Sequence, residues 1–224
     1  MEVLEIKRQA SAFFSAKLAP TEDGTQFHFQ AGQCINVLTA AEQKVCFSIA
    51  SEPEEKKFIE FLLKDQSSGA ACKISRMRVG DRLKISHPFG AGFPIEQFKR
   101  NDLLLVGIGS GLAPLRSLLK SLLRKNHQFQ QIALLYGARS QDEIPFKDEF
   151  DLWAKKIKVQ IAVSQPAGTA WNGFKGRVTD LVSKLEINPE GTICCICGNP
   201  EMESQVRNLL ETKGVSKQNI LLNY

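Results

Sequence analysis

The sequence has little of what several classes of protein require. Its only histidines, at positions 28, 87 and 127, lie in unrelated contexts and offer no catalytic triad. A zinc site needs two pairs of ligands, and the C-x-x-C spacing of Cys194 and Cys197 has no second pair to match it. The longest apolar stretch, residues 103–115, contains glycine and proline and is too short to span a bilayer. We therefore expect neither a metal centre nor a membrane span.

Excess charge is also small. Lys and Arg total 29 against 24 Asp and Glu, a formal net charge of +5. The basic residues are scattered and show no aromatic interleaving, whereas nucleic-acid binders concentrate basic residues on one stripe. The N-terminus carries Glu2 and Glu5 and lacks the basic-then-apolar pattern of a signal peptide. We expect a cytoplasmic protein that binds no nucleic acid.

What the chain does contain is the length and apolar content of a globular protein. Its 224 residues, 43% of them hydrophobic, can bury a core and form one or two domains. Three of the six cysteines fall in the apolar segment 193–197, where free cysteine behaves as a small hydrophobe. A chain of this length does not depend on disulfides. The pattern therefore predicts a buried strand and reduced thiols.

The N-terminal part has the pattern of an antiparallel β structure. Residues 3–7, 33–38 and 82–85 show partial or clean alternation of apolar and polar side chains, and residues 58–63 are more continuously apolar. Turn-rich segments separate them, and one short helix is expected near residues 70–77. Many short strands with few helical patterns favour a small barrel or sandwich.

The C-terminal part changes period. Short apolar runs at residues 103–106, 132–136, 159–163, 192–197 and 220–222 alternate with helical patterns near 115–123, 147–155, 179–185 and 200–213. This alternation predicts a doubly wound parallel sheet of five strands with helices on both faces. The charged segment 96–101 marks the expected boundary, which divides the chain into residues 1–98 and 99–224.

In a doubly wound sheet, ligands bind beyond the carboxyl ends of the strands. Several of the turns expected at those ends contain glycine close to the strand end, and a helix that begins near Pro114 would aim free N–H groups at an anion. Together they favour a phosphate-bearing nucleotide. The turn from Gly107 to Pro114 has the pattern G-x-G-x-G-x-x-P, which is neither the G-x-G-x-x-G fingerprint nor a Walker loop. Alone, it is equally compatible with a tight strand-to-helix turn.

Seven short motifs, in order along nearly the whole chain, resemble the ferredoxin–NADP reductase-like family in its short form, similar to NAD(P)H:flavin reductases. They are Ala31-Gly32-Gln33, Phe47-Ser48-Ile49-Ala50-Ser51, His87-Pro88-Phe89-Gly90, Gly109-Ser110-Gly111-Leu112-Ala113-Pro114, Tyr136-Gly137-Ala138-Arg139, Gly176-Arg177-Val178-Thr179 and Cys197-Gly198-Asn199-Pro200. The resemblance implies a flavin-binding β-barrel over residues 1–98 and a nicotinamide-nucleotide-binding α/β domain over residues 99–224. It also implies hydride transfer from NADH or NADPH to a flavin, FAD or else FMN.

The resemblance also implies roles for individual residues. Ser48 would hydrogen-bond near flavin N5, and Cys197 would face the nicotinamide, so these two are the candidate catalytic residues. Cofactor binding would fall to Phe47, Ile49, Ala50, Ser51, Gly69, Ala70, Ala71, Cys72, Gly109, Ser110, Gly111, Pro114, Arg139, Gly198 and Tyr224. For several of these a structural role competes: a strand serine, a core aromatic, a solvated arginine or a frayed chain end. Hydride transfer itself needs only aligned rings, not a strong acid or base.

Two positions depart from the family pattern. Val45 stands where the flavin motif normally begins with arginine, and Cys72 stands where the pyrophosphate turn normally has a hydroxyl. Losing both contacts should weaken the hold on the flavin phosphates, so the flavin is expected to bind loosely. At the end of the third strand, Gln165 occupies a position where NADP-selective relatives often carry arginine, which favours NADH.

Two other functions stay open. The chain could be an electron-transfer subunit that passes single electrons to a separate redox partner protein, since it contains no cysteine cluster with iron–sulfur spacing. It could instead be a non-catalytic nucleotide-binding descendant of such an enzyme, which Val45 and Cys72 would suit. Partners other than small nucleotides and a redox protein are not expected.

Overall fold

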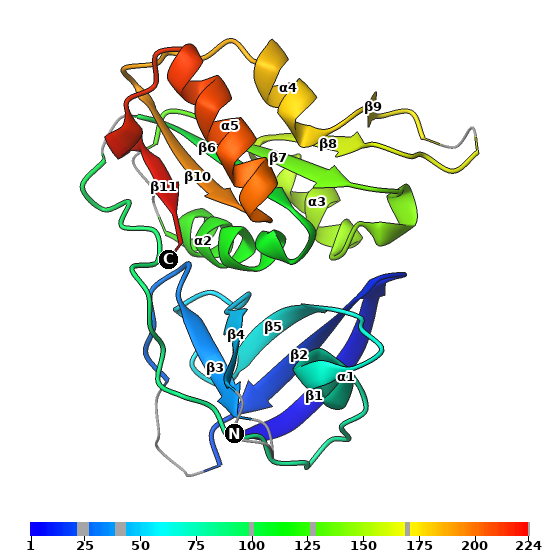
Figure 1. Cartoon of the computed structure of the whole chain (residues 1–224). Helices are drawn as coiled ribbons and strands as arrows, with labels where there is room; N and C mark the ends of the chain where they lie inside the picture. Colours follow the sequence, from blue (N-terminus) through cyan, green and yellow to red (C-terminus); the bar gives the residue numbers. More distant parts are fainter. Residues whose placement is uncertain (22–26, 39–43, 99–100, 126–128, 169–170, 224) are drawn as a thin grey trace.

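The computed structural model describes residues 1–21, 27–38, 44–98, 101–125, 129–168 and 171–223. The chain forms an antiparallel β structure followed by a parallel sheet with helices on both faces, as Figure 1 shows. This is the predicted order of fold classes. The predicted boundary after residue 98 falls at Lys99 and Arg100, which lie outside the described residues.

The antiparallel part consists of two small sheets closed by isolated bridges. Strands β1 (Glu2–Ala10), β2 (Phe13–Ala19) and β5 (Ile59–Lys64) form one sheet, and β3 (Cys34–Leu38) pairs with β4 (Lys44–Ser48) in a ribbon. A bridge from Ile49 to Phe61 joins the ribbon to β5. Side chains from all five strands fill the interior, and Phe14, Leu18 and Ile35 are among the largest buried ones.

Residues 82–85 do not form the strand that their alternation predicted. Arg82 bridges to Glu2 of β1, whereas Ile85 bridges to Val37 of β3. The segment thus crosses from one small sheet to the other, and neighbouring residues do not pair with the same strand. The structure also contains β2, which the sequence pattern did not predict. Phe13 to Ala16 are all buried, so no alternation marks this strand.

The parallel sheet has the strand order β11-β10-β6-β7-β8-β9. Its members are β6 (Asp102–Ile108), β7 (Ile132–Ala138), β8 (Lys158–Val163), β10 (Thr192–Cys197), β11 (Ile220–Leu222) and the two-residue β9 (Phe174–Lys175). Five of them were predicted, and β9 adds a sixth at the edge. The order reverses between β6 and β10, so the switch point lies between these central strands.

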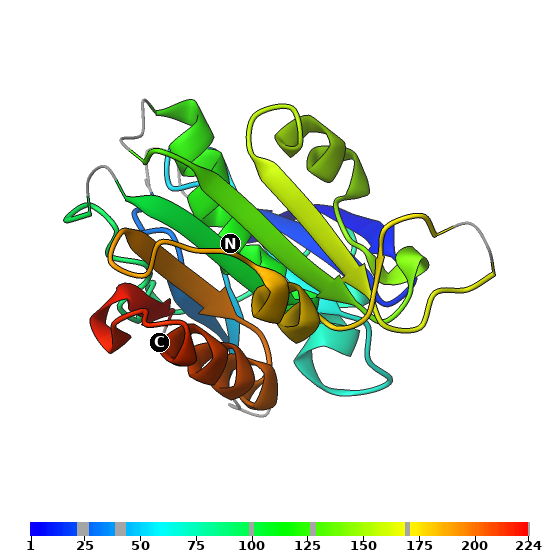
Figure 2. The same cartoon turned by 90° about the horizontal axis from the view of Figure 1, so that it is seen from above.

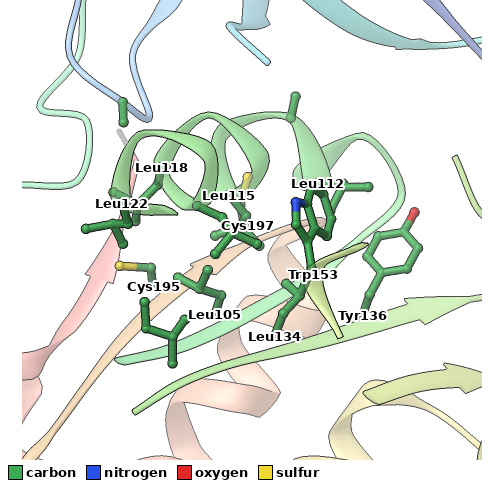
Figure 3. Close-up of a cluster of buried hydrophobic side chains, with 14 of the residues drawn as sticks. Leu105, Leu112, Leu115, Leu118, Leu122, Leu134, Tyr136, Trp153, Cys195 and Cys197 are labelled. Atoms are coloured by element: carbon green, nitrogen blue, oxygen red, sulfur yellow. The ribbon is translucent and has the colours of Figure 1, made fainter. Parts of the chain in front are cut away.

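Two layers of helices cover this sheet. Helices α2 (Leu112–Arg124) and α3 (Lys147–Trp153) lie on the face toward the barrel, while α4 (Val178–Lys184) and α5 (Pro200–Thr212) lie on the opposite face (Figures 1 and 2). In Figure 3 the leucines of α2 pack onto β6, β7 and β10, with Cys195 and Cys197 beneath them. The C-terminal cysteines are therefore core residues, as their apolar setting predicted.

Among the described residues, no helix combines the length and the apolar composition needed to cross a bilayer. The described part of the chain also brings no three histidine, cysteine or carboxylate side chains together in a way that could hold a metal ion.

Candidate functional site

A cleft of about 520 Å³ opens at the carboxyl ends of the parallel strands. This size falls within the range of small-ligand pockets. The cleft lies at the switch point, where Gly107 of β6 pairs with Cys197 of β10. Barrel residues also contribute to it: Phe13 and Lys64 line the same space as the turns after β6, β7 and β10. The cleft is therefore bounded by both parts of the molecule.

In the turn after β6, glycine allows the backbone to lie directly against the backbone at the end of β10. A Cβ added to Gly111 would lie 2.2 Å from the carbonyl oxygen of Cys197, a distance that no side chain tolerates. Gly109 has a φ of +55°, which suits glycine, and its carbonyl oxygen accepts a hydrogen bond of 3.1 Å from the buried Tyr136 hydroxyl. From this turn the α2 helix begins, and its first N–H groups point away from the helix toward the cleft end of the sheet.

Charged side chains of both signs line the cleft. Lys64, Arg139 and Arg177 provide positive charge, and Glu143 and Glu201 provide negative charge. The Nε of Arg139 donates to Gln165 Oε1 at 2.9 Å, which holds the guanidinium at the end of β8. An anionic ligand that extends across the cleft would thus meet cations from the barrel and from two different strand ends.

The turn after β10 is held by its own helix. The Gly198 N–H donates to Glu203 Oε1 at 2.9 Å, and Asn199 Oδ1 accepts from the Met202 N–H at 2.8 Å. Burial raises the pKa of Cys197 to about 12, and the nearby charges of Glu203 and Cys34 act in the same direction. Cys197 is therefore a neutral thiol at physiological pH.

Ser48 lies at the end of β4, where the barrel meets the last residues of the chain. Asn223 Nδ2 donates to Ser48 Oγ at 3.3 Å and to the Gly32 carbonyl oxygen at 3.1 Å. Directly across the ribbon from Ser48 is Cys34. A hydrogen bond from the Cys46 thiol, supported by Ser48, lowers the pKa of Cys34 to about 7 against the opposing effect of burial. In the parallel sheet Ile196 pairs with Leu222, so Cys197 and Asn223 are the next residues at two adjacent strand ends. Because Asn223 bonds to Ser48, both candidate catalytic residues lie near this edge of the sheet.

The structure gathers only some of the predicted site residues around the cleft. Gly109, Ser110, Gly111, Arg139 and Gly198 line it. Pro114 is buried in the first turn of α2, and Phe47 packs against the barrel core. Tyr224 lies outside the described residues.

Two residues of the predicted flavin motif, Ala50 and Ser51, face the junction between barrel and sheet, whereas Ile49 belongs to the barrel core. Ile49, Ala50 and Ser51 are all buried. The carbonyl oxygens of Ala50 and Ser51 accept hydrogen bonds from Arg116 and Ser117 of α2, and Ser51 Oγ accepts from the Glu60 N–H. The two carbonyl oxygens are thus already used in joining the two parts, and the Ser51 hydroxyl is used within the barrel.

The predicted phosphate turn forms the start of α1 (Gly69–Ser75). Gly69 has a φ of +81°, and Ala70, Ala71 and Cys72 are buried. The Cys72 thiol donates to the Ser67 carbonyl oxygen at 3.4 Å, so it does not offer its proton to a ligand. No described side chain caps the start of this helix.

The cleft also contains residues that the motifs did not identify. Lys64, Phe13, Glu201 and Gln205 line it, but none belongs to a recognisable spacing. Lys64 is the last residue of β5, distant in sequence from every strand end of the parallel sheet. Only the packing of the barrel against the sheet brings it there.

An antiparallel barrel beside a doubly wound sheet, with a glycine-lined cleft at the switch point, defines a class of nucleotide-binding oxidoreductases. Residues 105–208 match the family model described as an oxidoreductase NAD-binding domain. Sulfhydrogenase 2 subunit gamma of Pyrococcus furiosus is 30% identical over 98% of this chain and 81% of its own. The chain belongs to the ferredoxin–NADP reductase-like family.

Two further comparisons agree with this assignment. A subunit of the Na(+)-translocating NADH-quinone reductase of Mannheimia succiniciproducens is 31% identical over 79% of this chain, and the match spans about half of that relative, 47%. A ferredoxin NADP+ reductase from Neisseria gonorrhoeae, solved with bound FAD and NADP, superposes with a TM-score of 0.85 at 20% identity, covering 99% of this chain and 96% of its own. The last likeness concerns the fold.

Proposed function

We propose that this protein transfers hydride from NAD(P)H to a flavin, which passes the electrons to an acceptor. The observation that carries the proposal is the meeting of three chain segments at one place. Ser48 ends a barrel strand, Cys197 ends β10, and Asn223, which follows the β11 strand paired with β10, bonds to Ser48 Oγ and to the Gly32 carbonyl oxygen. Hydride transfer requires two rings to be aligned between such segments.

The cleft residues fit a nicotinamide dinucleotide. Gly109, Gly111 and Gly198 leave the backbone exposed to close approach, and the start of α2 offers N–H groups to a pyrophosphate. Arg139 and Lys64 supply positive charge at the rim of the cleft. These residues would bind and orient the dinucleotide.

The barrel residues fit one end of a flavin better than the other. Asn223 donates to Ser48 Oγ, so the Ser48 hydroxyl proton is available for an acceptor atom on a bound ring. At the phosphate end, Val45 and Cys72 offer no charge and no free hydroxyl. We infer that the ring end dominates recognition and that FAD, or FMN in its place, binds loosely. When bound, the flavin would accept two electrons and release them singly.

The chain's own residues need no proton shuttle for this step. Cys197 would pack its neutral thiol against the nicotinamide, and Ser48 would donate a hydrogen bond to the flavin ring. We propose NADH as the preferred donor, because Gln165 stands at the end of β8 and already engages Arg139. A strong kinetic preference for NADPH would contradict this assignment.

An anaerobic titration tests the proposal. The purified protein, supplied with free FAD or FMN, should bleach the visible absorbance of the flavin when NADH is added, faster than the flavin alone. Arg124→Met, an exposed change on α2, serves as a control that should behave like the wild type. If neither NADH nor NADPH reduces either flavin, the protein is a non-catalytic nucleotide-binding relative.

A second candidate function is that of an electron-transfer subunit. It is favoured by two of the similar proteins, which are subunits of a sulfhydrogenase and of a quinone reductase. The same titration, followed by addition of ferricyanide as a small acceptor, distinguishes the two. Rapid reoxidation by ferricyanide indicates a self-sufficient reductase, whereas slow turnover despite complete flavin reduction indicates dependence on a protein partner.

A further inference from the structure

Arg116 is a buried cation at the junction between the barrel and the parallel sheet. It lies on α2, and its side chain is only 4% exposed. Its Nη1 donates to the Ala50 carbonyl oxygen at 2.7 Å and to Glu60 Oε2 at 2.9 Å, both in the barrel. Its Nε and Nη2 donate to the two carboxylate oxygens of Glu149 at 2.8 and 2.6 Å. One guanidinium thus joins the barrel, α2 and α3.

The surroundings of Arg116 show that its position is tightly determined. The guanidinium carbon lies 4.1 Å from the centre of the Phe146 ring, which adds a cation–π contact. Burial alone would lower the pKa of Arg116, but Glu149 and Glu60 outweigh burial and raise it. The charge therefore stays in place, and its removal would leave the buried Glu60 and the partly exposed Glu149 without their partner.

The other contacts between α2 and the barrel are weaker by comparison. Arg124 pairs with Glu52 and Lys125 pairs with Glu54, but the two cationic side chains are 57% and 63% exposed. Solvent screens such pairs. Ser117 Oγ donates to the Ser51 carbonyl oxygen at 2.6 Å, a neutral bond. Among the described contacts between α2 and the barrel, those of Arg116 combine a buried side chain, a charge and several hydrogen bonds.

The two ends that Arg116 joins are the two ends of the proposed site. Ala50 follows Ser48 by two positions, and Arg116 follows the Gly109–Gly111 turn in the first turns of α2. We propose that Arg116 is a positioning residue that sets the distance between Ser48 in the barrel and the nucleotide-binding turn of the sheet, and thereby the alignment of nicotinamide and flavin. The inference rests on the proposed function.

A lysine could not do the same. Four of the five N–H groups of Arg116 are bonded in one plane to three acceptor groups. A lysine ammonium is a point charge on a flexible stem and cannot span a carboxylate on one side and a carbonyl on the other. Arg116→Lys should therefore keep the charge but lose the geometry.

The first experiment measures ring alignment in the flavin-loaded protein. A reduced nicotinamide stacked on an oxidised flavin gives a long-wavelength charge-transfer absorbance. We expect Arg116→Lys and Arg116→Met to lose this band.

The single-turnover rate of flavin reduction should fall about 10²-fold in both variants, since small misplacements have effects of this size. The KM for NADH should change less than about 3-fold, because Arg116 does not line the cleft. In Arg116→Ala, added guanidinium ion should partly restore the rate and the band.

The second experiment needs neither flavin nor activity. Cysteines placed at Val79 in the barrel and Leu152 on α3, which are 71% and 58% exposed, can carry spin labels in a Cys46→Ser background that removes the exposed native thiol. The distance distribution between the labels should be narrow with Arg116 present and broad or shifted in Arg116→Met. Arg124→Met is the matched control and should leave the distribution unchanged.

The two experiments separate the possible failures. If the wild type does not reduce flavin but Arg116→Met broadens the distribution, the proposed function fails and Arg116 remains an anchor of the two parts without a reaction to position. If flavin is reduced normally and Arg116→Met alters neither the charge-transfer band nor the distance distribution, the positioning role is wrong. A variant that is misfolded by circular dichroism is replaced by Glu149→Gln, which weakens the same network from the other side and should give the same changes to a smaller extent.

Discussion

The two sides of the proposed site differ in which groups form them: backbone on the sheet side and side chains on the barrel side. The sheet side consists of backbone: glycines that let the turns after β6 and β10 touch, and N–H groups at the start of α2. The barrel side consists of side chains, with Ser48 in place and Val45 and Cys72 where charge and hydroxyl would bind phosphate. A backbone site tolerates no added atom, whereas a side-chain site can lose contacts one at a time. We therefore expect the nucleotide side to be sensitive to small changes and the flavin side to be open to improvement.

The largest expected effect is on the sheet side. In Gly111→Ala the new methyl group would lie 2.2 Å from the Cys197 carbonyl oxygen, so β6 and β10 must move apart at the cleft. We expect NADH affinity to fall at least about 100-fold and the protein to lose roughly 2–3 kcal/mol of stability, in the range for overpacked sites. Fluorescence titration with NADH and thermal melting measure the two effects.

The control for this change is Gly168→Ala, where an added Cβ meets nothing within 4 Å. Gly168 has a positive φ, +63°, whereas Gly111 has a φ of −60°, so Gly168→Ala introduces backbone strain but no clash. It should lose only about 1 kcal/mol and bind NADH as the wild type does. Equal behaviour of the two variants would show that the close approach of the two turns is not what shapes the cleft.

On the barrel side the expected effect is a gain. Val45→Arg adds a cation near the start of the flavin motif, and a charge-assisted hydrogen bond contributes about 1.5–3 kcal/mol. We expect the Kd for FAD and FMN, measured by flavin fluorescence, to fall about 10-fold or more. Cys72→Ser should give a smaller gain in the same direction. Val79→Arg, at a barrel position that is 71% exposed, adds the same charge elsewhere and should change nothing. An unaltered Kd in Val45→Arg would place the flavin phosphates away from this strand.

A third prediction compares the two sides through their thiols. Burial raises the pKa of Cys194 and of Cys197 to about 12 from an unfolded value near 9.0. Each thiol has a higher pKa in the folded than in the unfolded protein. Its contribution to the free energy of unfolding is therefore complete below pH 9 and is lost as the pH rises toward the pKa of the folded protein. Each thiol should therefore cost about 1.4 kcal/mol per pH unit above pH 9.

Thermal melting between pH 8 and about 11 measures this loss. Cys194→Ala should show a shallower decline with pH than the wild type, whatever its absolute stability. Cys34, on the barrel side, has a lowered pKa because of its hydrogen bond with Cys46, so its contribution is present above the unfolded pKa and is lost as pH falls. The same hydrogen bond raises the pKa of Cys46, so the contribution of Cys46 has the same sign as that of Cys194. A parallel decline in Cys194→Ala and wild type would show that Cys194 does not titrate in this range.

The smallest effect is expected where the two sides touch. Asn223→Ala removes the donors to Ser48 Oγ and to the Gly32 carbonyl oxygen. Two neutral hydrogen bonds, one buried and one partly buried, are together equivalent to about 1–2 kcal/mol. We expect flavin reduction to slow about 5–10-fold with little change in NADH affinity, as stopped-flow measurements would show. Asn223→Asp, which can only accept, should be slower than Asn223→Ala because it takes the Ser48 proton for itself.

The sheet side could be predicted from the sequence because its determinants are local. Apolar runs, helix patterns and glycine at the strand ends placed all five main parallel strands and the turn around Gly109 and Gly111. Backbone approach leaves a trace in sequence, since only glycine is small enough. The two-residue β9 was missed because so short a strand carries no pattern.

The barrel side could be predicted only in part. Alternation identified the strands around residues 3–7, 33–38 and 58–63, but it failed for β2, whose first four residues are all buried, and for residues 82–85, which cross between sheets. The motif around Ser48 was visible, yet its neighbours Ala50 and Ser51 prove to bind α2. A short motif does not reveal which of its atoms face a ligand and which face another part of the chain.

The sequence by itself determined the class of fold, the order of its two parts and the position of the glycine turn after β6, because each depends on side-chain period and glycine within a few residues. Only the tertiary structure decided that Lys64 joins the cleft, that Asn223 reaches Ser48 and that Arg116 bonds to both Glu60 and Glu149. Those contacts join residues far apart in sequence, and no local pattern encodes them. The bonds of Arg116 form because the barrel packs against α2, which buries charged groups that must then find partners there.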